Sequence, residues 1–103
     1  MRLTMHSYRT EQSDSRKARI IDRVRAIPEG FVQTYGDIDG AAPRLVGHVL
    51  ATTHEDIPWH RVVRADGSLT QGRRQRELLL KEGVPMRGRR VDLEDARLPS
   101  YLS

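Results

Sequence analysis

The sequence predicts a small, mostly α-helical domain that contains a helix-turn-helix. Apolar residues recur at helical spacing in three separate stretches of the chain. Two short helices are predicted ahead of residue 57, and a tight glycine-containing connection joins them, as is typical of a helix-turn-helix. With 103 residues, the chain is long enough for one domain with a modest core.

The first helix is predicted to run from Asp14 or Ser15, either of which can cap it, to about Ala26. Its helically spaced apolar residues are Ala18, Ile20, Ile21, Val24 and Ile27. A Pro-Glu-Gly turn at residues 28–30 ends it. Residues 1–13 show no periodicity, so we expect them to form a flexible lead ahead of the domain.

The next two helices form the predicted helix-turn-helix. Residues 31–35 alternate in character before Gly36, which predicts a short extended segment leading into a brief helix near residues 37–41. Pro43 suits the first turn of a helix, where its missing N–H costs nothing, and this third helix is predicted over residues 44–53. The face opposite its apolar residues carries Arg44, Gly47, His48 and Ala51.

The second half of the chain is predicted to hold one helix and a hairpin. Residues 65–68 read Ala-Asp-Gly-Ser, and the Asp-Gly pair predicts a tight turn. A final helix is predicted over residues 73–82, with a leucine face and Gly83 at its end. Residues 84–93 predict a short strand or a hairpin around Gly88. We therefore place the domain at residues 14–93 and a tail at residues 94–103.

Arginine supplies nearly all of the positive charge. The chain has 18 Lys and Arg residues against 14 Asp and Glu residues, for a net charge of +4, and Lys17 and Lys81 are its only lysines. The planar guanidinium group suits contacts with phosphates and base edges, so the composition favours a nucleic-acid partner. A solvated arginine-rich surface without such a partner would give the same composition.

The chain has no cysteine, which excludes disulfides, thiolate metal sites and thiol chemistry together. No apolar run approaches the roughly 20 residues that a membrane-spanning helix needs. The polar start also lacks the apolar core of a signal peptide. We therefore expect a cytoplasmic protein that does not associate with membranes.

Five segments resemble, in the same order, the DNA-binding domain of the O6-alkylguanine-DNA alkyltransferases. They are residues 27–38, 44–47, 58–63, 66–69 and 79–83. In that family the third segment reads Pro-Cys-His-Arg-Val, and its cysteine accepts the alkyl group from the damaged base. Trp59 stands at the cysteine position here. Alkyl transfer needs a thiolate, so the resemblance is to the alkyltransferase-like subgroup, which binds the lesion without repairing it.

The resemblance implies a winged-helix-like domain that binds duplex DNA through the minor groove. Tyr35 matches the tyrosine that crowds a phosphate and helps to rotate the nucleotide outward, and Arg44 matches the arginine that fills the gap left behind. Gly47, Ala51 and His48 lie on the same helix face, and small residues there suit a groove only about 6 Å wide. The segment between Tyr35 and Arg44 is shorter than in the family, which predicts a truncated second helix.

The resemblance also implies a pocket for the flipped base beside Trp59, with backbone groups of Val62 and Val63 at its wall, where they can read the edge of the base. An arginine near Gly72 is implied to address the base; Arg73 and Arg74 are both candidates, and we place Arg73 in the pocket. His60 and Glu82 match the pair that activates the cysteine in the transferases. With no thiol to activate, we expect them to remain as a hydrogen-bonded pair that shapes the loop.

The function implied is non-enzymatic recognition of O6-alkylguanine in double-stranded DNA by nucleotide flipping, with the lesion then directed to nucleotide excision repair. We expect a monomer without a cofactor. A sequence-specific helix-turn-helix regulator is the alternative, and an enzyme using a water activated by His60 and Glu82 is a further one. His48, His54 and His60 fall six residues apart, which fits neither common zinc pattern, so we expect no metal site.

Overall fold

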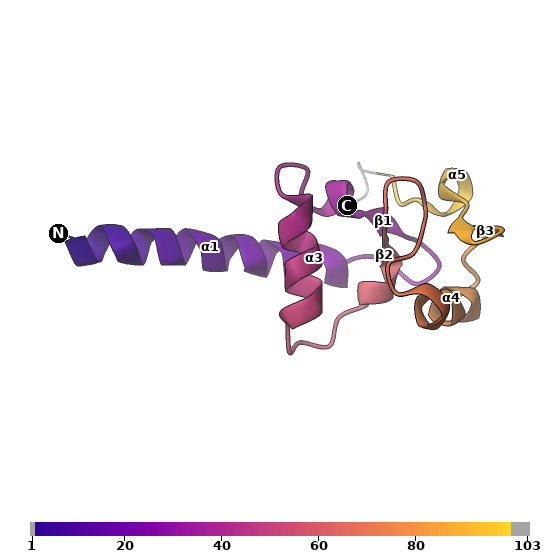
Figure 1. The fold of residues 1–103 in the computed structure, drawn as a ribbon, viewed down its shortest axis with the longest axis horizontal. Helices are drawn as coiled ribbons and strands as arrows, with labels where there is room; N and C mark the ends of the chain where they lie inside the picture. Colours follow the sequence, from indigo (N-terminus) through magenta and orange to yellow (C-terminus); the bar gives the residue numbers. More distant parts are fainter. Residues whose placement is uncertain (1, 100–103) are drawn as a thin grey trace.

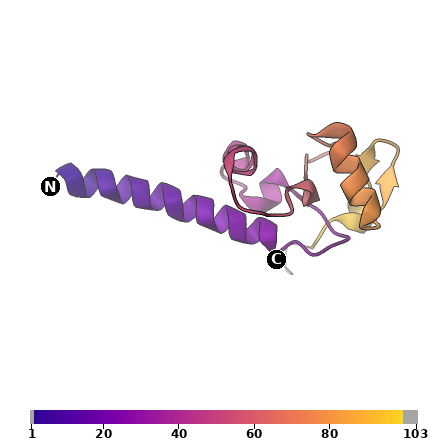
Figure 2. The same cartoon turned by 90° about the horizontal axis from the view of Figure 1, so that it is seen from below.

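A computed structural model of the protein describes the backbone of residues 2–99 and the side chains of residues 14–99. The first helix, α1 (Arg2–Arg25), projects far beyond the rest of the molecule (Figures 1 and 2). The whole molecule, this helix included, measures 55 × 27 × 20 Å. The predicted helix start at Asp14 or Ser15 is wrong, because α1 includes residues 2–13 of the expected flexible lead. Those residues contain no glycine or proline, so nothing in their sequence stops a helix that lacks apolar periodicity.

The C-terminal part of α1 anchors the fold. Ile20 and Val24 of α1, and Ile27 just after its end, are almost completely buried, while Ala18, which we grouped with them, is exposed. These three side chains share a core with residues of the next two helices and with Ile57 and Val62. Helical spacing therefore identified the buried face of α1, although it did not find where the helix starts.

The predicted helix-turn-helix consists of α2 (Tyr35–Ile38), a turn over residues 39–42, and α3 (Pro43–Thr52). Helix α2 has only four residues, as the shortened segment predicts, but it begins two residues before the predicted start at Asp37. Thr34 and Asp37 set that boundary by forming a capping box, in which each side chain accepts a hydrogen bond from the other's backbone N–H. Pro43 occupies the first turn of α3, as predicted.

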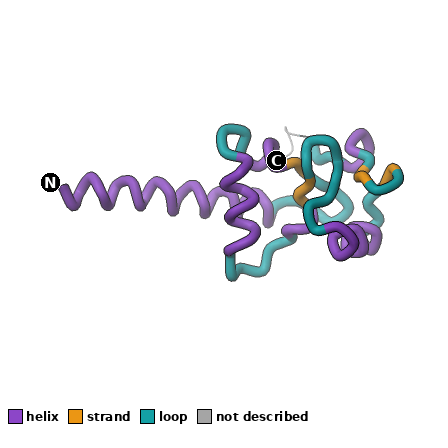
Figure 3. The backbone as a smooth tube through the Cα atoms, viewed as in Figure 1, coloured by secondary structure: helices purple, strands orange, loops and turns teal. Residues whose placement is uncertain are grey.

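Two short strands connect the two halves of the domain. β1 (Gln33–Thr34) pairs in parallel with β2 (Val62–Val63), with Gln33 opposite Val62 and Thr34 opposite Val63. Val62 packs into the core of the first three helices, and its neighbour Val63 packs into a second core with Leu79 and Val84. The strand pair thus lies between the two cores (Figure 3).

The second core is covered by helix α4 (Gly72–Lys81), by the antiparallel pair β3 (Met86–Arg87) and β4 (Arg90–Val91), and by α5 (Leu93–Ala96). The mostly helical fold and the hairpin around Gly88 agree with the sequence prediction.

The predicted tail at residues 94–103 is corrected for the part that the structure describes. Ala96 and Leu98 are buried, and the backbone of Val32 exchanges hydrogen bonds of 2.9 and 2.8 Å with these two residues. The Arg97 guanidinium also binds the Asp37 carboxylate, at 2.6 and 3.0 Å. The C-terminal segment is therefore part of the domain up to residue 99, and residues 100–103 lie outside the described range. None of the described helices combines the length and apolar character needed to span a bilayer.

Candidate DNA-lesion site

A concavity of about 420 Å³ opens between the two halves of the domain. The helix-turn-helix contributes four of its lining residues, and α4 with the loop before it contributes three. The last, Trp59, comes from the segment between α3 and β2. The lining residues are Tyr35, Gly47, Leu50, Ala51, Trp59, Thr70, Gln71 and Arg74. Trp59 therefore faces an open, partly aromatic cavity.

Trp59 begins a short 3₁₀ helix, η1 (Trp59–Arg61), that leads directly into β2. The Arg74 guanidinium carbon lies 5.6 Å from the centre of the Trp59 ring, within the range of a cation–π interaction. The His60 ring meets the Trp59 ring edge to face, with the centroids 5.9 Å apart. Trp59 is thus held by neighbours while it still lines the cavity.

Tyr35 packs closely on the side of the cavity that the helix-turn-helix forms. A Cβ built on Gly47 would lie 3.9 Å from Cε1 of Tyr35, so the tyrosine ring packs against α3 at its glycine. The Tyr35 hydroxyl also shares a 3.1 Å hydrogen bond with the Thr70 hydroxyl. This bond joins the two walls of the cavity, which Tyr35, Gly47 and Ala51 line together with Trp59.

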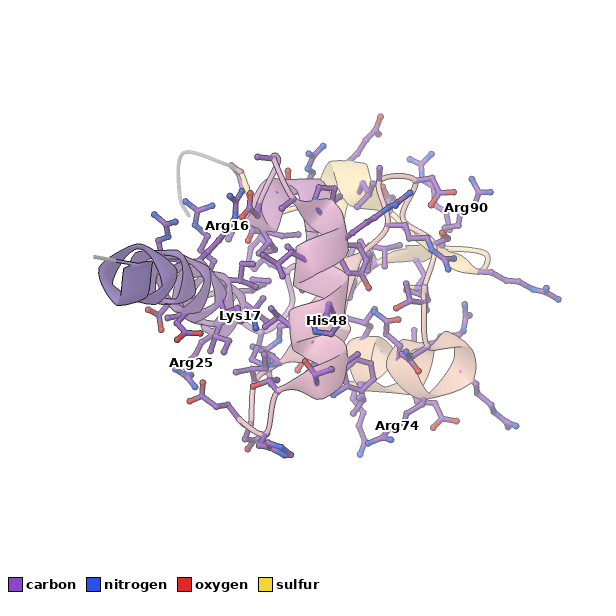
Figure 4. All side chains as sticks on the ribbon, turned by 60° about the vertical axis from the view of Figure 1, so that its left-hand side comes forward. Arg16, Lys17, Arg25, His48, Arg74 and Arg90 are labelled. Carbon is purple, nitrogen blue, oxygen red and sulfur yellow. The ribbon has the colours of Figure 1, made fainter. Side chains whose placement is uncertain are left out.

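Arg44 and His48 lie outside the cavity lining, on the exposed face of α3. In Figure 4 the His48 side chain stands on the face of α3 that is turned toward the viewer. Arg44 belongs to the first turn of α3 and forms no ion pair among the described side chains. Both residues are therefore free to meet a ligand that lies across this face.

The other side of η1 is filled by a compact ionic cluster. The Arg61 guanidinium binds both carboxylate oxygens of Glu82, at 2.9 and 2.7 Å, and it donates a third bond of 2.8 Å to the Ile27 carbonyl. His60 Nε2 lies 2.9 Å from Glu82 Oε2, so the expected pairing of these two residues is present. The side chains of all three cluster members are only 12–16% exposed.

The cluster keeps Glu82 ionised. Hydrogen bonds from the Arg61 guanidinium lower the pKa of Glu82 to about 2, and the bond with His60 adds to the effect against the opposing cost of burial. Arg61 itself gains a raised pKa from the same contact. A carboxylate with this pKa, and with both oxygens already accepting hydrogen bonds, is a poor general base near neutral pH.

Gln75 is a site residue that the sequence analysis missed. Its side chain is fully buried and donates hydrogen bonds to the carbonyls of His60 and Val62, at 3.0 and 2.9 Å. Its amide oxygen accepts from the backbone N–H of Gln71, at 3.1 Å. Gln75 thereby fixes α4 against the loop that carries Trp59. Its spacing of four residues from the buried Leu79 was the available signal, because both then lie on one helix face.

The structure corrects one of the predicted pocket residues, Arg73. The Arg73 side chain is 92% exposed, pairs with Glu77 at 3.4 Å, and lines a different concavity, whereas Arg74 lines the cavity beside Trp59. Consecutive helix residues point about 100° apart, so the two arginines face different sides of α4. Val62 and Val63, whose backbone groups we expected at the pocket wall, are not among the residues that line the cavity, and their side chains are buried in the two cores.

The three histidines with six-residue spacing do not come together. Among the described side chains, no three His, Asp or Glu residues gather into a group that could hold a metal ion.

Comparison with known proteins places these features in a family. The family described as "6-O-methylguanine DNA methyltransferase, DNA binding domain" matches residues 15–84. The "DNA base-flipping protein" of Escherichia coli is 41% identical over 99 residues, which cover 84% of this chain and 77% of that protein. "Alkyltransferase-like protein 1" of Schizosaccharomyces pombe is 30% identical over 97 residues, covering 82% of this chain and 90% of that protein.

A solved structure agrees with both relatives. The crystal structure of S. pombe Atl1 in complex with damaged DNA containing O6-carboxymethylguanine superimposes with a TM-score of 0.68 at 28% identity. The match covers 84% of this chain and 97% of that one. The chain therefore belongs to the family of the 6-O-methylguanine DNA methyltransferase DNA-binding domain.

Proposed function

We propose that this protein recognises O6-alkylguanine in duplex DNA by rotating the damaged nucleotide into the cavity beside Trp59, without removing the alkyl group. The observation that carries the proposal is the position of Trp59. It occupies the place of the reactive cysteine in the motif and lines an open cavity of about 420 Å³ between the helix-turn-helix and α4. Relatives named for base flipping, and one solved with damaged DNA, support the same function.

The cavity suits an alkylated purine on chemical grounds. Trp59 offers an aromatic face to the base and an apolar surface to the alkyl group, and stacking of this kind contributes about 1–3 kcal/mol per base. Arg74 beside the indole can donate hydrogen bonds to a base edge. An alkylated guanine pairs poorly with its partner, so rotating it out of the helix costs less than rotating an intact base.

The exposed face of α3 is the proposed contact with the minor groove. Gly47 and Ala51 add little bulk, which matters in a groove about 6 Å wide. Tyr35 stands at the rim of the cavity, where it can press on the phosphate of the rotating nucleotide. Arg44 has a planar guanidinium that can stack in the vacated gap and hydrogen-bond the orphaned base.

The His60–Glu82 pair is proposed to be structural. Glu82 is ionised and shares both oxygens with Arg61, and this arrangement leaves no free base to activate a water molecule. The chain has no thiol that could accept an alkyl group. We propose that the protein instead holds the lesion in a distorted duplex that nucleotide excision repair proteins then process.

Substitution of Trp59 tests this proposal. With a labelled duplex carrying one O6-methylguanine, Trp59→Ala should lower affinity by about 5- to 150-fold, the equivalent of the stacking energy. Binding to the undamaged duplex should change little, and Trp59→Phe should retain most of the lesion preference because it keeps an aromatic face. Equal lesion affinity for the wild type and the alanine variant would show that the base does not enter this cavity.

Arg44→Ala provides a second test at the helix-turn-helix. Loss of the gap-filling side chain should weaken lesion binding on the order of tenfold, as measured by anisotropy with the same duplexes. Unchanged lesion affinity would show that Arg44 does not enter the duplex. If the wild type instead bound damaged and undamaged duplexes equally and responded only to base sequence, the chain would act as a helix-turn-helix regulator.

A further inference from the structure

A second concavity, of about 580 Å³, lies on the opposite side of the start of α4 from the Trp59 cavity. Four arginines line it, together with Leu69, Ser68 and two glycines. We call the four the arginine cradle: Arg73, Arg76, Arg89 and Arg90. None of the activities proposed above uses these residues, yet they amount to a quarter of the sixteen arginines in the chain.

The cradle has a defined shape because its walls are tied together. Arg76 Nη1 donates a 2.6 Å hydrogen bond to the Gly88 carbonyl and so joins α4 to the turn of the β3–β4 hairpin. On the adjacent side, Val91 N–H donates to the Gly67 carbonyl at 2.9 Å. Gly67 has a φ of +84°, and a Cβ there would lie 2.5 Å from the Val91 carbonyl oxygen, so only glycine allows this close approach.

The positive charge of the cradle is poorly neutralised. No carboxylate is among its lining residues. At its rim Glu77 lies 3.4 Å from Arg73, in an exposed pair, and Asp66 lies 3.8 Å from Arg90 while it accepts closer bonds of 2.9 and 2.6 Å from Ser68. Exposed pairs of this kind contribute little. Arg89 is exposed and makes no ion pair or side-chain hydrogen bond among the described residues.

The cradle continues the proposed DNA site. Thr70, Gln71 and Arg74 line the Trp59 cavity, while Gly72 and Arg73 line the cradle, so one stretch of chain forms a wall of both. In Figure 4, Arg74 and Arg90 lie on the same side of α3, to the right of His48. The two concavities therefore meet at the start of α4, where they occupy different faces of that helix.

We propose that the arginine cradle binds the sugar–phosphate backbone of duplex DNA that flanks the lesion. This inference rests on the proposed function, because the Trp59 cavity fixes where the duplex lies. Guanidinium groups match phosphate oxygens through paired N–H donors, and Leu69 with the arginine stems offers an apolar surface to the sugars. The cradle binds damaged and undamaged DNA alike, since phosphates carry no information about the base.

The salt dependence of binding tests the cradle directly. Each lost phosphate contact should lower the slope of log affinity against log salt by about 0.9 for duplex DNA. Arg73→Gln/Arg89→Gln should therefore lower the slope by about 1.8 with either duplex, and the ratio of lesion to undamaged affinity should stay the same. Lys81→Gln is the matched control, because it removes a charge at the far end of α4, outside the cradle, and should leave the slope unchanged.

Duplexes with the lesion near one end sharpen the test. The difference between the wild type and the double variant should vanish when the arm that reaches the cradle is removed, and it should persist when the other arm is removed. An unchanged slope in the double variant, with lesion preference intact, would contradict DNA binding by the cradle. It would point to an acidic protein segment as the ligand instead. Failure of the proposed function would differ, because the wild type itself would then show no lesion preference.

Discussion

The two sides of η1 differ in almost every physical respect. On one side Trp59 lines an open cavity whose other residues are mostly small, apolar or uncharged. On the other side His60 and Arg61 meet Glu82 in a cluster with little exposure and an almost complete set of hydrogen bonds. Three consecutive residues thus serve an open site and a closed ionic cluster.

Under the proposed function, this difference is what a binding site that has lost its chemistry would show. A chain without cysteine has no thiol nucleophile, but the proposed base-binding cavity still needs a loop with a fixed position. Arg61 ties this loop to Glu82 and to the end of the first helix, and Gln75 ties it to α4. The groups that match the activating pair of the transferases therefore still have a structural task here.

Breaking the ionic cluster of His60, Arg61 and Glu82 should cause the largest loss of stability. Glu82→Ala leaves the Arg61 guanidinium and the His60 ring without their shared partner, and removing one member of a buried ion pair costs about 3 kcal/mol or more. Urea denaturation should show this loss in the free energy of unfolding. Glu77→Ala is the matched control, because its pair with Arg73 is exposed and should contribute less than about 0.5 kcal/mol. Equal losses in both variants would contradict a special role for the cluster.

Acid should weaken the same side selectively. Glu82 has a pKa of about 2 in the folded protein, below the ordinary value of 4.5, so its contribution is complete above pH 4.5 and is lost as the pH falls toward 2. The shift of roughly 2.5 pKa units corresponds to about 3 kcal/mol. The difference in unfolding free energy between the wild type and Glu82→Gln should shrink over this window. A constant difference between pH 5 and pH 2.5 would mean that the carboxylate is not responsible.

Substitutions at the Trp59 cavity should have smaller effects, and these should appear only in lesion binding. Arg74→Gln removes the cation beside Trp59 and should lower the preference for the lesion about two- to fivefold, the equivalent of about 0.5–1 kcal/mol. Arg73→Gln removes the same charge one residue earlier and should leave that preference intact. Competition binding with damaged and undamaged duplexes measures both. A larger loss of preference for Arg73→Gln would reverse our assignment.

Local sequence signals predicted the elements that local interactions determine. The bounds of α3, α4 and the β3–β4 hairpin were predicted to within a residue or two. The signals were the proline at the start of α3, the leucine face of α4 with Gly83 after it, and the glycine at the centre of the hairpin. The role of residues 94–99 was missed, because Val32 pairs with Arg97 across most of the chain and no local pattern reports such a contact.

The sequence identified several residues of the candidate site, but it did not show which way each side chain points. Tyr35, Gly47, Ala51 and Trp59, which the motifs single out, line one cavity, although the first three were predicted as contacts with the minor groove and not as pocket residues. The choice between Arg73 and Arg74 depends on where α4 begins, since a shift of one residue turns a side chain by about 100°. Gln75 was missed because a buried amide is recognised by the carbonyls that it satisfies, and these belong to another segment.

The most direct test of the central claim uses the fluorescence of Trp59, the only tryptophan in the chain. The protein would be titrated with a short duplex containing one O6-methylguanine and, in parallel, with the same duplex containing guanine. A base that enters the cavity should change the Trp59 emission strongly and bind more tightly when it is methylated. Equal, salt-sensitive binding of both duplexes without a change in emission would contradict the account.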